Sequence, residues 1–515
     1  MTQNERLSLP IWKKLILFVF SIFFFLIQLF IMLVVFDISI EYTASPIKWI
    51  YFLTLGAGVC FVLYIIHKPI SVHYKLTWSI MILIFPLPFI ALYIFNSSSR
   101  KLSKRKQRQI KKAIHQYANR DDALEKLKQE DPVGARLFQA LKHSVSFSVW
   151  DNVKFTYFND CMDKLDDLLL ELKKAEKYIF IEYFIIAKGY IMDQILPILQ
   201  EKGNDGVQIK ILYDDIGSKG VMPKKLLKKI SKIPNCKINN YEPLGLNINF
   251  LVNNRDHRKI MVIDGRVAYC GGDNLADEYI HKKERFGYWR DNCGKYEGNV
   301  ALTFAALFLE MWYISTKEVV ELDYNPVDYK HNEPGYVMAF GDGPHNNSNP
   351  AYDLFHALIN SANEYLYIST PYFVIDDQTV SAIALKAKSG VDVRVLMPKK
   401  PDKKSVFYMS RAHYREILKA GGKFYEYTPG FNHAKNIIVD DKYAFIGTVN
   451  MDYRSLFLHY ECGALIALND QIIKMREDFE NAVSASEEID YPKWKKRPWY
   501  QKLIAFILNI FAPLF

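Results

Sequence analysis

Residues 257–264 read HRKIMVID and residues 433–440 read HAKNIIVD, so one pattern of His, Lys and Asp occurs twice in the chain. Each copy continues into a glycine-containing turn that ends in asparagine, GGDN at 271–274 and GTVN at 447–450. A single H-x-K pair on a strand is usually a solvated face. The matching downstream residues instead indicate a duplicated unit with a shared role.

The local sequence around each copy predicts a hairpin. Residues two apart on a strand face the same side, so His257 and Lys259 are expected to project together. Asp264 and Gly265 predict a two-residue turn, with RVAYC as the returning strand. In the second copy DDK turns and YAFIG returns. Each asparagine then lies near the start of a helix, where N–H groups can bind an anion.

Two imidazoles and two ammonium groups at one point suit an attack on a phosphodiester. One histidine attacks phosphorus, the other protonates the leaving oxygen, and lysine and asparagine hold the phosphate oxygens. The candidate catalytic residues are His257, Lys259, Asp264, His433, Lys435 and Asp440, and the candidate phosphate-binding residues are Asn274 and Asn450. Within this set we expect Asp264 and Asp440 to be structural. They would hold either the hairpin or the contact between the two duplicated lobes of the chain.

A nucleophilic histidine needs a carboxylate to hold its second ring nitrogen. Asp291, in a Trp-Arg-Asp stretch, is the candidate partner of His257. Glu461, downstream of His433, is the second candidate. The alternative for both carboxylates is an ordinary surface salt bridge.

Together with the two motifs, four stretches resemble the phospholipase D superfamily and, within it, the bacterial cardiolipin synthases. These stretches are GGDNLADEY at 271–279, WRD at 289–291, TPYF at 370–373 and GTVNMDYRSLFLHYE at 447–461. The chain departs from the family pattern at Cys270, Asp273 and Asn432. An inward Asp273 carboxylate would weaken anion binding, so we expect that side chain to point away.

The resemblance implies a phosphohistidine intermediate, with His257 as the nucleophile and His433 as the acid, although the spacing itself does not distinguish them. It implies transfer of a phosphatidyl group from one phosphatidylglycerol to another, with release of glycerol. A membrane phospholipase D, or a phosphatidyltransferase with a different alcohol acceptor, is the alternative. We expect no cofactor and no metal, because cationic and donor side chains already surround the phosphate. The D-x-x-D-G-x-x-A-R run of metal-dependent CDP-alcohol phosphatidyltransferases is absent from the sequence.

An internal duplication sets the fold class. Residues 175–185 echo 362–373, and 206–215 echo 390–400, each pairing a helix end with an apolar strand. Alternating strands and helices predict an α/β fold. The resemblance implies two duplicated phospholipase D-like lobes, each a mixed sheet flanked by helices, with both motifs at their seam. The expected regions are a membrane-embedded part at 1–99, a basic linker helix at 100–142, lobes at 143–325 and 326–490, and an amphipathic membrane-associating segment at 491–515.

Three apolar segments, at 15–36, 49–66 and 76–95, predict a transmembrane helical region. Basic residues at the N-terminus and in the run at 100–112 both favour the cytoplasmic side. Three crossings cannot satisfy both, so we expect two, with the Pro-containing third segment bent or re-entrant. The prediction is a multi-pass protein of the bacterial cell membrane, with its lobes on the cytoplasmic face.

The chain has 515 residues and a net charge of +10. Its basic residues cluster beside apolar segments, which favours anionic lipid over nucleic acid as the partner. The six cysteines show no C-x-x-C spacing and predict neither a zinc site nor a disulfide framework. The expected partners are phosphatidylglycerol and an anionic phospholipid bilayer, with no nucleic acid; homo-oligomerisation is left open.

Overall fold

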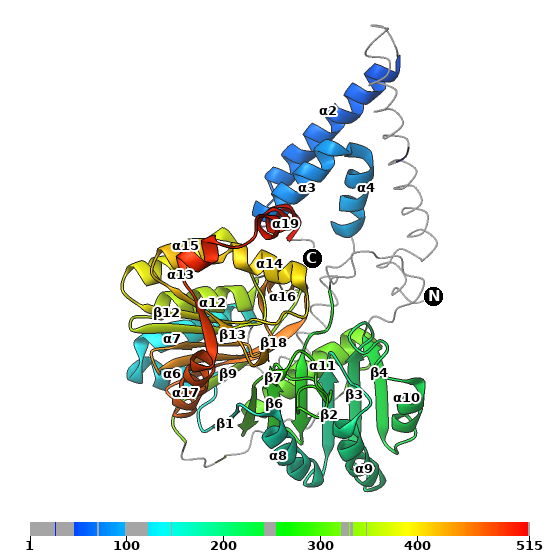
Figure 1. Cartoon of the computed structure of the whole chain (residues 1–515). Coiled ribbons are helices and arrows are strands. Elements are labelled where there is room, and N and C mark those ends of the chain that lie inside the picture. The colour runs from blue at the N-terminus through cyan, green and yellow to red at the C-terminus, as the bar shows by residue number, and fades with distance from the viewer. Residues whose placement is uncertain are drawn as a thin grey trace. The chain divides into compact units, whose positions relative to one another are not determined.

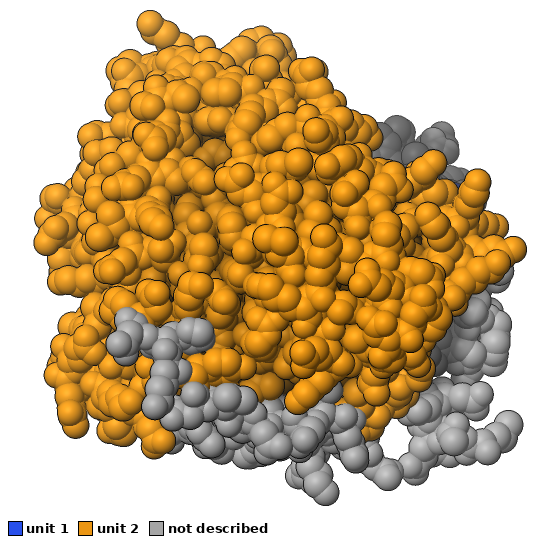
Figure 2. Space-filling view, turned by 90° about the horizontal axis from the view of Figure 1, so that it is seen from below, with its two compact units in different colours: residues 1–105, 244–253, 507–515 blue, residues 106–243, 254–506 orange. Residues whose placement is uncertain are grey.

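A computed structural model describes residues 26, 46–68, 72–97, 122–145, 147–241, 254–320, 329, 333–346 and 348–512. The chain divides into two compact units. Unit 1 comprises Met1–Arg105, Leu244–Asn253 and Ile507–Phe515, and unit 2 comprises Lys106–Pro243 and Asn254–Phe506. Unit 2, orange in Figure 2, contains both H-x-K motifs.

The first lobe of unit 2 is built on a seven-stranded mixed sheet in the order β1-β8-β6-β5-β2-β3-β4 (Figure 1). Its strands are β1 (Lys154–Phe158), β2 (Tyr178–Tyr183), β3 (Gln208–Asp214), β4 (Cys236–Tyr241), β5 (Lys259–Ile263), β6 (Val267–Gly271) and β8 (Cys293–Glu297). β2, β3 and β4 are parallel, and the remaining pairs are antiparallel.

The second lobe has an eight-stranded sheet in the order β19-β13-β12-β10-β15-β16-β18-β9. Its strands are β9 (Tyr336–Asp342), β10 (Tyr365–Ser369), β12 (Asp392–Pro398), β13 (Lys423–Tyr427), β15 (Asn436–Val439), β16 (Tyr443–Gly447), β18 (Glu461–Ala467) and β19 (Ser486–Ile489). Read from β9, this sheet repeats the strand order and directions of the first and adds β19. The predicted duplication is therefore confirmed, with β2 and β3 as the counterparts of β10 and β12.

Helices cover both sheets. Those of the first lobe are α8 (Cys161–Lys173), α9 (Tyr190–Asn204), α10 (Lys224–Ile230) and α11 (Val300–Thr316). Those of the second are α12 (Pro350–Ser361), α13 (Asp377–Lys388), α14 (Lys404–Ala412), α15 (Tyr414–Lys419), α16 (Tyr453–Phe457) and α17 (Gln471–Ser484). α11 is apolar on every side and contacts β2, β5 and β6 of one sheet and β9 of the other. An all-round apolar helix has to be buried, so α11 joins the two lobes.

A basic linker helix is expected at 100–142, and the described residues 122–145 form two packed helices instead of one. They form α6 (Asp122–Glu130) and α7 (Pro132–Val145), which pack on each other, and α7 also contacts α12 and β9. Leu127 and Phe138 are fully buried. Both helices are amphipathic, with an apolar face at helical spacing, and burying that face makes them part of the second lobe.

Short strand pairs connect the lobes beside the two motifs. β7 (Tyr288–Arg290) runs parallel to β14 (Gly430–Asn432), with Arg290 opposite Asn432. At the equivalent place in the other half, Asp256 forms a parallel bridge with Tyr460. The regular strands of the motifs begin at Lys259 and Asn436. The histidines therefore precede their strands, contrary to the prediction that His257 lies on one.

Unit 1 contains three described helices, α2 (Pro46–Ile66), α3 (Val72–Ile84) and α4 (Pro86–Ser97). The apolar segment at 76–95 is divided at Phe85, and Pro86 opens α4, where a missing N–H is tolerated. The predicted interruption is therefore confirmed. The predicted segment at 15–36 lies outside the described residues, apart from Leu26. Within the described ranges, none of the helices has the length and apolar composition required to cross a membrane.

The C-terminal part of the chain forms α18 (Tyr491–Lys495) and α19 (Trp499–Ile510). Apolar side chains of α19 are exposed, with Trp499 at 74% and Phe506 at 69%. The helix is far shorter than the roughly 20 residues needed to span a bilayer, as its sequence predicts.

Candidate active site

His257 is held by a carboxylate from the other lobe. Its Nδ1 lies 2.9 Å from Oε1 and 3.0 Å from Oε2 of Glu461, which is completely buried. The Oγ1 of Thr448 donates a second hydrogen bond to Oε2 at 2.5 Å. With its Nδ1–H donated to Glu461, the imidazole keeps the lone pair on Nε2 for substrate.

His433 has the same arrangement with the lobes exchanged. Its Nδ1 lies 2.6 Å from Oδ2 of Asp291, and Oδ1 of that carboxylate accepts from the N–H of Asn292 at 2.9 Å. The predicted pairing of Asp291 with His257 is therefore wrong. The physical reason is the exchange of short strands, since β7 leads into Asp291 and lies beside β14, which leads into His433.

Backbone hydrogen bonds between the lobes fix both histidine–carboxylate pairs. The N–H of His257 donates to the carbonyl of Tyr460 at 2.9 Å, and the N–H of His433 donates to the carbonyl of Arg290 at 2.7 Å. Tyr460 and Arg290 each immediately precede the carboxylate residue. The chain therefore delivers each carboxylate to the histidine of the opposite lobe.

The sheet register shows that the two carboxylates are counterparts. Gly271 lies opposite Cys293 in the first sheet, and Gly447 lies opposite Gly463 in the second. Asp291 and Glu461 each stand two residues before the partner of that glycine. Because they are equivalent in the duplication, the site has an approximate two-fold symmetry that the linear sequence conceals.

The two lysines are buried beside the histidines. The Nζ of Lys259 donates to the carbonyl of His257 at 2.6 Å, and Lys435 makes the equivalent bond to His433. Burial lowers the pKa of Lys259. Burial, assisted by the charge of Lys259, lowers the pKa of Lys435 to about 7. The charge on Lys435 is therefore sensitive to pH near neutrality.

Both imidazoles of the H-x-K motifs are neutral at pH 7. Burial, followed by the charges of Lys259 and Lys435, lowers the pKa of His257 well below its usual value. Burial and Lys435 lower the pKa of His433 to about 4, against the opposing effect of Asp291. A neutral imidazole suits a nucleophile, whereas an acid needs a proton. The expectation that His433 donates near pH 7 therefore requires substrate to alter the site.

Asp264 and Asp440 bond to the backbone, and among the described residues neither accepts a hydrogen bond from a histidine. The Asp264 carboxylate accepts from the N–H groups of residues 176–178, at 2.8–2.9 Å. Asp440 accepts from the N–H groups of residues 363–365 over the same distances. Each aspartate holds its hairpin turn on the start of the neighbouring strand, β2 or β10. These contacts agree with a structural place for both aspartates, and their catalytic role stays a prediction.

The two asparagines differ. The Asn274 Oδ1 accepts from the N–H of Ile185 at 3.0 Å, and its Nδ2 donates to the hydroxyl of Tyr279 at 2.6 Å. The Asn450 Oδ1 is buried without a hydrogen-bond partner among the described residues. An amide oxygen cannot donate to a phosphate, so only the Nδ2 groups could bind one, and that of Asn274 already donates to Tyr279. Asn450 is therefore the better phosphate-binding candidate of the two.

Asp273 is neutralised by an ion pair. Its Oδ2 lies 2.8 Å from the Nζ of Lys164, and both side chains are buried. The attraction of Asp273 keeps the pKa of Lys164 well above its usual value against the opposing effect of burial. The expected conflict between this carboxylate and a bound phosphate is therefore removed.

Sequence reasoning missed the ring that stands beside each histidine. The ring of His459 lies 5.3 Å from that of His257, and the ring of Trp289 lies 5.5 Å from that of His433. Each ring residue stands two positions before its carboxylate, so His459 and Trp289 are counterparts. The only sequence signal is proximity, since His459 is close to Glu461 in HYE.

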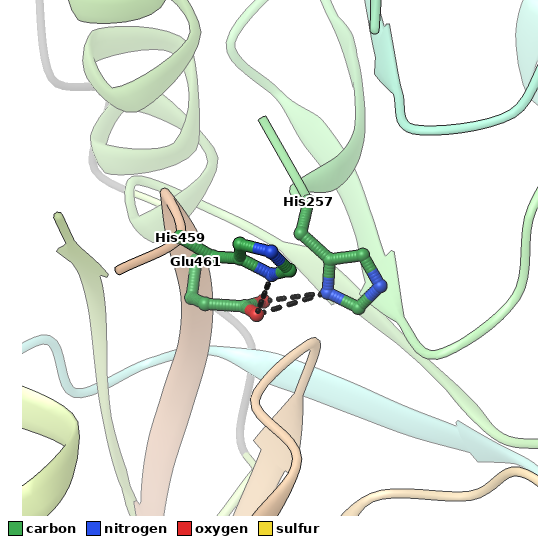
Figure 3. A group of neighbouring side chains, drawn as sticks. All are labelled: His257, His459 and Glu461. Atoms are coloured by element: carbon green, nitrogen blue, oxygen red, sulfur yellow. Dashed lines mark hydrogen bonds and ion pairs between the residues drawn. The ribbon is translucent and has the colours of Figure 1, made fainter. Parts of the chain in front are cut away.

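His459 also completes a cluster that could hold a metal ion. Its Nδ1 lies 3.5 Å from Oε1 of Glu461, on the side where His257 approaches the same carboxylate (Figure 3). Burial lowers the pKa of His459 to about 3. Among the described residues, no other group of three or more metal-ligating side chains converges in this way.

Comparisons with known proteins agree on the family. The family model "Cardiolipin synthase, PLD-like domain" matches residues 168–290 and 355–483. A cardiolipin synthase of Alkalihalophilus pseudofirmus is 33% identical over 450 residues, covering 85% of this chain and 88% of that protein. An uncharacterized protein of Streptococcus mutans is 36% identical over 459 residues, covering 88% of this chain and 99% of its own length.

The solved structures agree on the fold. The crystal structure of phosphatidylserine synthase from Haemophilus influenzae aligns with a TM-score of 0.56, at 16% identity, covering 74% of this chain and 98% of that one. At this identity the likeness concerns the fold alone. It places the two-lobed arrangement described above among known architectures.

Proposed function

Because this chain belongs to the cardiolipin synthases of the phospholipase D superfamily and is a phosphatidyltransferase, we propose that it joins two phosphatidylglycerol molecules into cardiolipin and releases glycerol. The observation that supports this most is the convergence of two neutral imidazoles, each held by a buried carboxylate of the opposite lobe. Such a pair can take up and release a phosphatidyl group in two matched steps.

In the first step the Nε2 of His257 attacks the phosphorus of one phosphatidylglycerol. The P–N bond forms as the bond to the glycerol oxygen breaks, and His433 gives that oxygen a proton. In the second step His433 removes the proton from the terminal hydroxyl of another phosphatidylglycerol. That oxygen attacks phosphorus, the P–N bond breaks, and His257 is regenerated. Glu461 stabilises the positive charge that develops on the ring of His257.

The buried cations neutralise the negative charge on the oxygens of the phosphoryl group. Lys259 and Lys435 lie beside the histidines, and Asn450 contributes its amide, so nonbridging oxygens meet donors on both sides. An anionic phosphate offsets the charge of Lys435, one of the causes of the low pKa of His433. Binding of substrate therefore raises that pKa and lets His433 carry the proton that it donates.

We also place the lobes on an anionic leaflet. The exposed apolar side chains of α19 lie next to exposed Lys495, Lys496 and Lys502, a combination typical of a helix in the membrane interface. The basic run at 100–112, outside the described residues, would add attraction of roughly 1 kcal/mol per cation at the surface. Multi-pass insertion through the N-terminal segments, with the lobes in the cytoplasm, completes this proposal.

The function is tested with detergent-solubilised full-length protein and phosphatidylglycerol as the sole lipid. Mass spectrometry should find cardiolipin and glycerol in equal amounts, with no requirement for a CDP-lipid and no loss of activity in EDTA. Phosphatidic acid as the only lipid product would identify a hydrolase instead. Formation of new diesters only when a different alcohol is added would identify another phosphatidyltransferase.

The membrane placement has a separate test. The full-length protein, reconstituted from detergent, should modify only the lipids of the leaflet that its lobes face. A protein lacking residues 503–515 should hold its lobes less firmly on anionic vesicles, and the difference should shrink at high salt, where surface charges are screened. Equal behaviour with zwitterionic vesicles would remove the lipid role of α19.

A further inference from the structure

The half-site around His257 contains one more ligating side chain than catalysis uses. His257, His459 and Glu461 each offer an atom that lies within 4.8 Å of the other two (Figure 3). His257 and His459 approach the same Oε1 of Glu461, at 2.9 Å and 3.5 Å. The three residues come from two lobes, so only the folded protein brings them together.

The chemistry of this set matches a transition metal. Two imidazoles and a carboxylate form one of the ligand sets found in zinc enzymes, and imidazole favours Zn²⁺, Co²⁺ and Cu²⁺ over Mg²⁺ or Ca²⁺. His459 is 8% exposed, and within the described part of the chain neither of its ring nitrogens makes a hydrogen bond. A neutral imidazole keeps one lone pair, and the Nδ1 of His459 lies on the Glu461 side of the ring, so the ring can offer that nitrogen to an ion in the cluster.

The second half-site supplies an internal control. The counterpart of His459 there is Trp289, whose indole nitrogen carries a hydrogen and cannot ligate a metal. His433 and Asp291 therefore lack the third ligand. If the duplication has left a metal site, it exists in one half alone.

We propose that His257, His459 and Glu461 bind a Zn²⁺-type ion that inhibits the enzyme. The inhibition rests on the proposed role of His257 as nucleophile. A neutral imidazole has one lone-pair nitrogen, and a metal on Nδ1 moves the ring proton from Nδ1 to Nε2. The atom that attacks phosphorus then has no free electron pair, and Glu461 ligates the metal instead of orienting the ring.

Neighbouring charges limit the affinity. Lys259 and Lys435 are buried near the cluster, and their positive charge opposes a dication. The site should therefore bind more weakly than a structural zinc site, and chelators should empty it readily. A site of this kind would make the activity depend on the concentration of free metal, and the inhibition would be reversible.

The first test measures binding without turnover. Metal-free full-length protein is dialysed against Zn²⁺, and one equivalent should bind, with Mg²⁺ failing to compete. His459→Asn should lower the affinity at least about tenfold. His433→Ala is the matched control and should bind as the wild type does, because its half-site contributes no ligand. Equal Zn²⁺ binding by wild type and His459→Asn would overturn the site.

A second measurement needs no variant. X-ray absorption of the Zn²⁺-loaded wild type should show two imidazole nitrogens and carboxylate oxygen around the ion; a shell without two imidazoles contradicts the proposal. Zn²⁺ should inhibit cardiolipin formation reversibly, with EDTA restoring it, and His459→Asn should resist. Zinc binding in a protein that makes no cardiolipin would refute the proposed function alone. An active protein that binds no zinc would refute this inference alone.

Discussion

The two half-sites share a backbone plan and differ in the surroundings of their carboxylates. In one, His257 meets Glu461, with Thr448 and His459 alongside. In the other, His433 meets Asp291, with Trp289 alongside. The duplication has preserved the histidines, the lysines and the turn-holding aspartates. The difference lies in how each ring is held, which is where the proposed nucleophile and the proposed acid have different needs.

Gly272 shows how tightly each version is built. It occupies the position of Thr448 in the other copy, and a Cβ added there would lie 2.1 Å from Oδ1 of Asp291. The shorter aspartate is thus matched with glycine, and the longer glutamate with a threonine whose hydroxyl supports it. Exchanging one member of either pair would leave a clash or an unsatisfied oxygen.

The histidines should give the largest effect. His257→Ala should lower turnover by more than about 10⁴-fold and His433→Ala by about 10²–10⁴-fold, because an acid contributes about 10²–10⁴ and a nucleophile more. A phosphatidyl donor with an activated leaving group should label His433→Ala covalently at residue 257, detected by mass spectrometry. Label at residue 433 in His257→Ala would reverse the assignment. His356→Ala, away from the site, is the control.

The carboxylates should separate the two roles. Glu461→Gln and Asp291→Asn should each cost about 10²–10⁴ in kcat, since each ring loses the group that fixes its tautomer. A p-nitrophenyl donor needs no acid, so it should rescue the first step in Asp291→Asn and leave Glu461→Gln impaired. Pre-steady-state release of p-nitrophenol measures this. Equal rescue of both variants would show that the half-sites are not specialised.

Lys435 should make the half-sites respond differently to pH. Its ammonium, with a pKa lowered to about 7, stabilises phosphate while charged, so kcat/KM should fall as pH rises through about 7, close to tenfold per unit above it. Lys435→Arg stays charged and should shift this limb upward by more than one unit. Lys419→Arg on the surface should not. An unchanged limb in Lys435→Arg would assign it to another group.

The aspartates of the turns test what the two halves keep in common, and their effect is the smallest. Asp264→Asn and Asp440→Asn tolerate the left-handed backbone at these positions, with φ of 56° and 53°. Each weakens bonds to three N–H groups and should cost about 1–3 kcal/mol. The melting temperature in detergent should fall by similar amounts for both variants, and it should not fall for the control variant Asp193→Asn. A loss of turnover without a loss of stability would restore a catalytic role.

Patterns formed by residues close together in one lobe could be predicted from the sequence. The H-x-K spacing, the Asp-Gly turn and the strand echoes depend on local periodicity, and the duplication makes each visible twice. The pairing of Asp291 and Glu461 could not be predicted, because it depends on short strands exchanged between lobes. His459 was missed for a related reason, since its neighbour His257 is two hundred positions away. The hydrogen bond that occupies the Asn274 oxygen could not be predicted either. Its donor is the N–H of Ile185, and no motif identifies that residue.

The crossing of carboxylates also sets when the protein becomes active during its own synthesis. Glu461 follows His257 by 204 positions. At roughly 5–20 residues per second, a ribosome needs about 10–40 s to add them. Until then the first lobe carries an imidazole without its carboxylate, and the proposed site of a partly made chain is incomplete. Completion of the second lobe is therefore the event that starts the chemistry.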